Sequence, residues 1–78
     1  MAKSKTTKEE IILKKIGDRI SELRKTAGKS QSVFSYEMGW DNPNLRKIEK
    51  GKTNPTVKTL IKIADVLNIS LSELLKID

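Results

Sequence analysis

The sequence predicts an all-α protein, a compact bundle of five helices in one domain. Apolar residues recur at steps of three and four, which is the spacing of one face of a helix. Capping residues precede the apolar segments, and glycine or asparagine follows most of them. No segment shows the alternation typical of a strand. With 78 residues, 36% of them apolar, the chain can build one modest core.

The first predicted helix follows a short polar segment. We expect residues 1–6 to form a flexible N-terminal arm ahead of a domain that spans residues 7–78. Thr7 and Glu10 have the spacing of a capping box at the helix start, and Gly28 suits its C-terminal end. The inner face is expected to consist of Ile12, Ile16, Ile20, Leu23 and Ala27.

The second predicted helix begins after Ser30, a good N-cap residue, and ends at Gly39. Phe34 and Met38 are expected on its buried side, with the small Ser35 beside them. Gly39 permits the positive φ that a sharp turn into the next helix needs.

The third predicted helix lies between Asp41, its expected N-cap, and Gly51. Pro43 is compatible with this assignment because it falls in the first turn, where backbone N–H groups have no helical partners. Leu45 and Ile48 are expected to face inward. Most of the remaining positions carry amides or cations, so the outer side of this helix offers hydrogen-bond donors.

Two further helices complete the predicted bundle. A turn at residues 54–55 precedes Thr56, the expected N-cap of the fourth helix, and Asn68 closes that helix. Its expected inner stripe consists of Val57, Leu60, Ile61, Ala64 and Leu67. Ser70 and Glu73 have the spacing of a second capping box, which opens a short last helix. The apolar side of that helix consists of Leu71, Leu74 and Leu75.

The composition argues against several classes of chemistry. Zero cysteines exclude disulfides and thiolate sites, and zero histidines remove the side chain that most often transfers protons near neutral pH. Carboxylates, lysines and hydroxyls do not cluster, so we expect no catalytic residues, no metal and no cofactor. No apolar segment approaches the roughly 18 residues of a membrane span, and the N-terminus lacks a signal-peptide pattern. We therefore expect a cytoplasmic protein without membrane contact.

The charge distribution favours an anionic partner. The net charge is +6, from 16 lysines and arginines against 10 aspartates and glutamates. Residues 42–62 carry six basic side chains and one acidic side chain, a net of +5, so most of the excess lies in this segment. Small basic domains commonly bind phosphates. An ordinary solvated helix face would have a similar composition, so charge alone leaves both interpretations open.

Several of these residues occur in an order that is found in a known family. The set comprises Ser30-Gln31, Gly39, the segment Ile48-Glu49-Lys50-Gly51-Lys52 and Pro55, and it continues through residues 60–70. It resembles the phage-repressor type of helix-turn-helix domain, the XRE family. The resemblance implies a five-helix lambda-repressor-like fold whose second and third helices form the helix-turn-helix. It also implies a sequence-specific double-stranded DNA-binding transcriptional regulator, often a repressor, that acts as a homodimer on a palindromic operator.

The residues expected to contact DNA lie at the starts of the second and third helices and just after the third. They are Ser30, Gln31, Asn42, Pro43, Asn44, Arg46, Lys47 and Lys52. The free N–H groups and the positive dipole end of the second helix suit a phosphate. An asparagine can bond N6 and N7 of adenine, and a lysine favours O6 and N7 of guanine. The resemblance implies base contacts for Asn42, Pro43 and Lys47, and for Arg46 a contact to either a base or the DNA backbone. Asn42 and Asn44 could instead only support the helix start.

Glu49 is the one acidic residue within the basic segment, and it lies near a helix C-terminus, where the dipole disfavours a negative charge. Such a placement requires a cationic partner. The resemblance pairs this position with an arginine at the end of the first helix, which is Arg24 in this sequence. We therefore expect Arg24 and Glu49 to form a structural salt bridge.

Two questions about protein partners stay open. The last segment is rich in apolar side chains, so we expect a homodimer interface formed by Leu71, Leu74, Leu75 and Ile77. These residues could alternatively complete the core of the monomer. The second question is whether the chain is an antitoxin, which would bind a toxin protein and autoregulate its operon. Few residues are left over for a toxin-binding segment, which favours the regulator.

Overall fold

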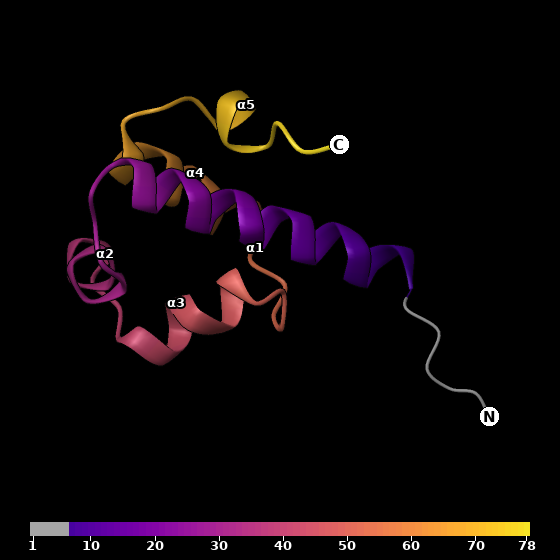
Figure 1. Ribbon diagram of the computed structural model, residues 1–78, viewed down its shortest axis with the longest axis horizontal. Helices are drawn as coiled ribbons and strands as arrows, with labels where there is room; N and C mark the ends of the chain where they lie inside the picture. Colours follow the sequence, from indigo (N-terminus) through magenta and orange to yellow (C-terminus); the bar gives the residue numbers. More distant parts are fainter. Residues whose placement is uncertain (1–6) are drawn as a thin grey trace.

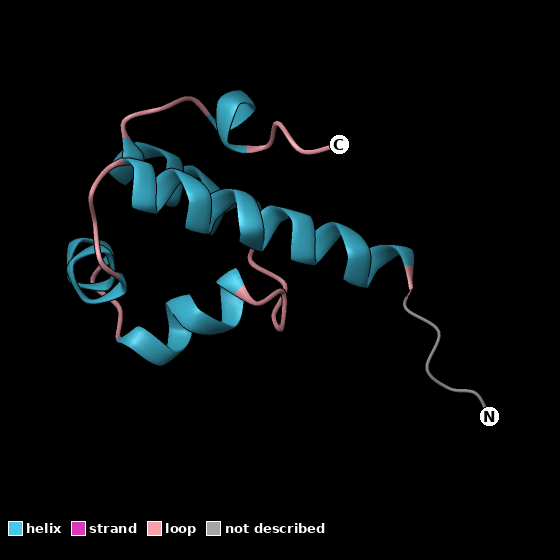
Figure 2. Ribbon diagram, in the orientation of Figure 1, coloured by secondary structure: helices cyan, strands magenta, loops and turns pink. Residues whose placement is uncertain are grey.

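The computed structural model describes residues 7–78, and these form five α-helices and no strand. The helices are α1 (Lys8–Thr26), α2 (Gln31–Met38), α3 (Asn42–Glu49), α4 (Val57–Leu67) and α5 (Leu71–Leu74). Figure 1 follows the chain from the long α1 to the short α5, and Figure 2 shows the loops that join the helices. The predicted fold is confirmed, whereas the arm predicted for residues 1–6 lies outside the described residues. No helix described here is both long and apolar enough to cross a membrane.

Hydroxyl side chains cap four of these helices at their N-termini. At α1 the cap is a full box: Thr7 Oγ1 accepts from the N–H of Glu10 at 3.1 Å, and Glu10 Oε1 accepts from the N–H of Thr7 at 3.0 Å. The hydroxyls that cap α2, α4 and α5 belong to Ser30, Thr56 and Ser70. The box predicted at α5 is incomplete, because the Glu73 carboxylate accepts instead from Arg19 Nη2 at 2.9 Å.

The N-terminus of α3 lacks the capping hydrogen bond that the other four helices have. Asp41 occupies the N-cap position of α3, as predicted, but its side chain makes no capping hydrogen bond. Gly39, with φ at +76°, makes the left-handed turn from α2 into this helix. Pro43 lies in the first turn, where its missing N–H costs no helical hydrogen bond. The start of α3 is therefore not fixed by a side-chain cap of its own.

One hydrophobic core joins all five helices. It consists of Ile20, Phe34, Met38, Leu45, Ile48, Leu60, Ile63, Ala64 and Leu74, each at most 7% exposed. α1 and α2 both pack against α3, and α4 packs against α2 and α5. Because full burial of one large apolar side chain contributes about 1.5–3 kcal/mol, these contacts fix how the helices lie relative to one another.

Two core positions predicted on α4 are wrong. Val57 is 63% exposed and Ile61 is 45% exposed, whereas Ile63 is fully buried. Seven of the eleven residues of α4 are apolar, so its sequence allows two overlapping inner faces. The buried face is the one that contains Leu60, Ile63 and Ala64, which belong to the same core as the buried residues of α2 and α5.

The N-terminal turns of α1 project beyond the core. Ile12 is 42% exposed, although we expected it on the inner face, and Ala27 is exposed just past the helix end. Ile16, Ile20 and Leu23 do lie in the core or pack against it. In Figure 1 the first turns of α1 extend past α3. The N-terminal turns of α1 therefore extend beyond the part of this helix that the other helices cover.

Gly17 lies within α1 at the point where α1 meets α3. A Cβ atom at this position would lie 2.5 Å from the backbone oxygens of both Ile48 and Glu49. Since such contacts are too short for a real side chain, only glycine lets the two backbones approach this closely. The sequence prediction overlooked Gly17, and an isolated glycine inside a helical pattern was the available signal.

A buried ion pair holds the C-terminal end of α3. The Glu49 carboxylate accepts from Arg24 Nε at 2.7 Å and from Arg24 Nη2 at 3.1 Å, and the side chains of Arg24 and Glu49 are 7% and 5% exposed. Gln31 Nε2 donates to the same carboxylate at 3.0 Å, and Arg24 Nη1 donates to the backbone oxygen of Lys29 at 2.7 Å. One carboxylate thereby joins α1, α2 and α3.

We expect Glu49→Ala and Arg24→Ala each to lower the free energy of unfolding by about 3–5 kcal/mol, because each leaves one buried charge unpaired. Urea unfolding followed by circular dichroism measures this change. Lys14→Ala is the matched control, since it breaks the exposed Lys14–Asp18 pair and should change stability by less than about 0.5 kcal/mol. If Glu49→Ala and Lys14→Ala unfold alike, the buried network does not hold the helices together.

Gly17→Ala should destabilise the protein, although the replacement of glycine by alanine within a helix usually stabilises it. Alanine in place of glycine within an exposed helix usually adds about 1 kcal/mol of stability. Here we expect a loss of at least about 1 kcal/mol, because the new Cβ would displace the backbone of α3. Lys25→Ala, on the exposed side of the same helix, should stay within about 0.5 kcal/mol of the wild type. A Gly17→Ala variant more stable than the wild type would contradict the close approach of α1 and α3.

Candidate nucleic-acid interface

The helix α3 has one buried and one exposed side. Leu45, Ile48 and Glu49 form the buried side. The exposed side consists of Pro43, Asn44, Arg46 and Lys47, and the first residue, Asn42, is half-buried. Lys50, the residue after the helix end, is exposed as well. Figure 1 shows α3 at the lower edge of the molecule, with α1 above it. Most of the residues predicted to contact DNA therefore lie together on an accessible helix surface.

Six basic side chains on α3, the loop after it and α4 have no acidic partner among residues 7–78. They are Arg46, Lys47, Lys50, Lys52, Lys58 and Lys62, and all of them are exposed. The ion pairs within the described residues involve other cations, namely Lys14, Arg19, Arg24, Lys29 and Lys76. Nine cations among residues 7–78 have no acidic partner, and six of the nine lie in residues 46–62, on α3, the loop after it and α4. The other three, Lys8, Lys15 and Lys25, lie on α1. A concentration of unpaired cations in one segment is the arrangement that attracts a polyanion.

The start of α2 contributes the next two candidate residues. Ser30 Oγ accepts from the N–H of Val33 at 3.1 Å, so this hydroxyl acts as the N-cap. Gln31 donates one N–H to Glu49 and is half-buried, so its side chain is partly committed to the buried network. A contact from Gln31 to phosphate stays a prediction, and it would have to use the second N–H of the amide or the backbone.

A hydrogen bond that the sequence prediction missed joins the two helices of the helix-turn-helix. Asn42 Nδ2 donates to Ser32 Oγ at 3.0 Å, and this bond connects the first turn of α2 to the first residue of α3. No local pattern could reveal it, because the partners are ten residues apart and meet only when α2 and α3 pack. Asn44, by contrast, is exposed, and its side chain has no hydrogen bond within the described residues.

The residues predicted to form the dimer interface differ in how deeply the monomer buries them. Leu74 is 0% exposed within the monomer core, so it supports α5 from inside and is not available to a partner chain. Leu71 and Leu75 are half-buried against the same core, and Ile77 is also half-buried. The reason is that α5 packs on α4 and that Arg19 on α1 donates to both the backbone oxygen and the carboxylate of Glu73, each at 2.9 Å.

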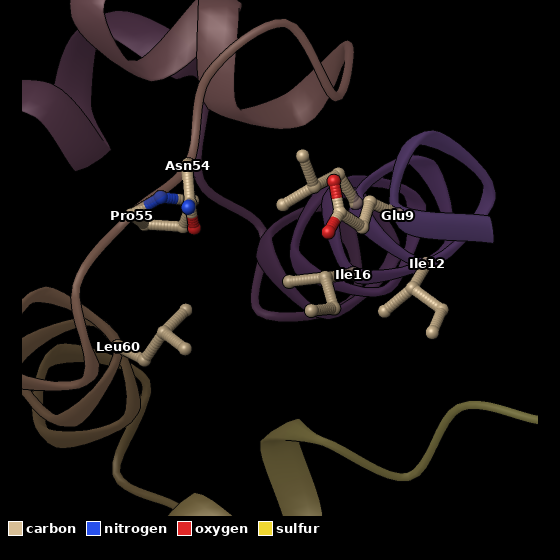
Figure 3. A pocket seen from close by; sticks show the side chains of 7 residues that line it. Glu9, Ile12, Ile16, Asn54, Pro55 and Leu60 are labelled. Carbon is tan, nitrogen blue, oxygen red and sulfur yellow. The ribbon is translucent and has the colours of Figure 1, made fainter. Parts of the chain in front are cut away.

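A hollow of about 360 Å³ lies between the first turns of α1 and the segment that leads into α4. Figure 3 shows Ile16 and Glu9 on one side and Pro55 and Leu60 on the other. Its lining is mostly apolar and includes one carboxylate, which is too few groups for metal binding or paired acid–base work. Across residues 7–78, no three His, Cys, Asp or Glu side chains are grouped so that they could hold a metal ion.

Comparison with known proteins identifies the family of this chain. The helix-turn-helix model HTH_3 matches residues 20–74. RstR, the transcriptional repressor of the cryptic phage CTXphi from Vibrio cholerae, is 40% identical over 60 residues, which cover 77% of this chain and 54% of RstR. The chain therefore spans about half the length of that repressor. The HTH-type transcriptional regulator YazB of Bacillus subtilis is 40% identical over 58 residues, which cover 74% of this chain and 84% of YazB.

Two solved structures support the same assignment. The restriction-modification controller protein C.AhdI from Aeromonas hydrophila has a TM-score of 0.76 and 34% identity, covering 80% of this chain and 94% of its own. The biofilm master regulator SinR, solved in complex with DNA, has a TM-score of 0.71 and 37% identity, covering 78% of this chain and 98% of its own. The chain therefore belongs to the HTH_3 (XRE) family of helix-turn-helix, DNA-binding transcriptional regulators.

Proposed function

We propose that this chain binds a palindromic double-stranded DNA operator as a homodimer and acts there in the cytoplasm as a repressor. The observation that carries the proposal is the presentation of α3, whose inner side is locked by the buried Arg24–Glu49 pair while its outer side is exposed and cationic. An α-helix fits the DNA major groove, where each base pair displays a distinct pattern of donors and acceptors. The name of RstR as a repressor supports the sign of regulation.

The residues on the outer side of α3 would read bases. Lys47 is exposed and unpaired within the described residues, and an ammonium group suits the O6 and N7 acceptors of guanine. Asn42 and Asn44 carry amides that suit adenine, and Pro43 can offer only apolar contact to a thymine methyl group. Arg46 would contact either a base or the backbone.

The phosphate contacts would flank this helix. The first N–H groups of α2 lack helical partners and lie at the positive end of its dipole, so the segment around Ser30 and Gln31 suits one phosphate. Lys52, exposed in the loop after α3, would grip a second phosphate. These contacts orient the protein on the duplex without reading its sequence.

A two-fold dimer would place its two α3 helices one turn of DNA apart, about 34 Å. Since Leu74 is enclosed in the monomer, the apolar candidates that remain for this interface are Leu71, Leu75 and Ile77. The relatives described above are named as a repressor, regulators and a controller protein, so we propose a regulator in preference to an antitoxin.

Selection of binding sites from a random duplex pool tests the proposal. We expect a wild-type consensus of two half-sites related by two-fold symmetry. Lys47→Ala should lose the preference at one base pair in each half-site and about 1–3 kcal/mol of binding free energy per half-site, because one base contact is removed in each. Lys52→Ala is the matched control: it removes the same charge but should weaken binding to all duplexes alike. The slope of log K against log salt concentration should become smaller by about 1 for each half-site, because each half-site loses one phosphate contact.

Each part of this proposal can fail separately. An unchanged consensus for Lys47→Ala would contradict base reading by that residue. A wild-type consensus of one asymmetric half-site would contradict the two-fold dimer. Affinity that does not fall with rising salt would contradict the role of the exposed cations, because phosphate neutralisation releases counterions.

A further inference from the structure

The two ends of α3 are held in different ways. At the C-terminal end, Glu49 is buried and charged, and it is bonded to both Arg24 and Gln31. At the N-terminal end, Asp41 provides no side-chain cap, and the side-chain bond that holds Asn42 is the one from its Nδ2 to Ser32 Oγ. Ser32 is exposed, so in the free protein water competes for the hydrogen bond between Asn42 and Ser32.

The orientation of the Asn42 amide decides which base it can read. An asparagine amide has two N–H groups and one carbonyl oxygen. With one N–H donated to Ser32, Asn42 keeps one N–H and its Oδ1, which are the groups that N7 and N6 of adenine require. The reversed amide would turn Oδ1 toward Ser32 and leave only N–H groups outward, which would suit the O6 and N7 acceptors of guanine.

The Ser32 hydroxyl alone allows both orientations, because it can donate as well as accept. Ser32 is the second residue of α2, in the helix turn that we propose to place against a phosphate. When the hydroxyl proton is donated to a phosphate oxygen, the Ser32 oxygen can only accept, and only Nδ2 of Asn42 can then face it. The contact with the DNA backbone would thereby set the contact with the base.

We propose that Ser32 is a positioning residue for sequence specificity: it accepts from Asn42 Nδ2 while it donates to phosphate, and so makes Asn42 select adenine over guanine. This inference rests on the proposed function, since it requires α3 to lie in the major groove. An exposed bond between neutral groups adds little to the stability of the free protein, so the effect of Ser32 is on base choice and not on folding.

Site selection, followed by competition between duplexes that differ at one base pair, tests this inference. The base pair read by Asn42 is the one whose preference disappears in Asn42→Ala. At that base pair we expect Ser32→Ala to reduce the preference for adenine over guanine about tenfold, within the range for one bidentate contact. Ser32→Thr keeps the hydroxyl and should keep the preference. Ser72→Ala, an exposed serine on α5, should match the wild type.

Two further readouts separate positioning from a structural effect. The melting temperature of free Ser32→Ala should equal that of the wild type, and Ser32→Ala should have no further effect on base preference in the Asn42→Ala background. The inference is overturned if Ser32→Ala keeps the full preference for adenine, or if its effect falls on a different base pair from that of Asn42→Ala. If the wild type itself selects no consensus, the proposed function fails, and this inference fails with it.

Discussion

The Glu49 carboxylate is the group on which the presentation of α3 depends. It is buried near the C-terminus of a helix, where burial and the helix dipole both disfavour a negative charge. Arg24 offsets that cost with two hydrogen bonds and Gln31 adds a third. Burial of the charged carboxylate is therefore favourable only when α1, α2 and α3 are packed together. The packing at Gly17 is the steric counterpart, because α3 can approach α1 closely only where no side chain intervenes.

Charge pairing distinguishes the contacts that hold the helices together from the exposed cations around α3. Charges that the fold uses are buried or paired, as in Arg24–Glu49 and Arg19–Glu73. The cations around α3 have no acidic partner among the described residues, so they repel one another in the free protein and are neutralised only by an external anion. A duplex supplies such an anion with a regular spacing of phosphates. The Arg24–Glu49 pair holds the buried side of α3, and the exposed side carries cations without an acidic partner among the described residues. Together these two features make a surface suited to DNA.

Local signals in the sequence predicted the helices well, because caps and turns depend on short segments: Ser30 caps its helix and Gly39 makes the turn, as expected. Features that depend on packing were harder to predict. The inner face of α4 contains Ile63 in place of Ile61 because its apolar pattern is ambiguous and neighbouring helices decide. The bond between Ser32 and Asn42 has no sequence signature at all, and the enclosure of Leu74 follows from the docking of α5.

The central claim is that the outer side of α3 and the start of α2 form the surface that meets DNA. Backbone amide NMR shifts, recorded while a selected operator duplex is titrated into the protein, test this claim most directly. We expect the largest shifts in residues 31–32, 42, 44–47 and 51–52. Shifts concentrated in α5 or in the first turns of α1, with residues 42 and 44–47 unchanged, would contradict it.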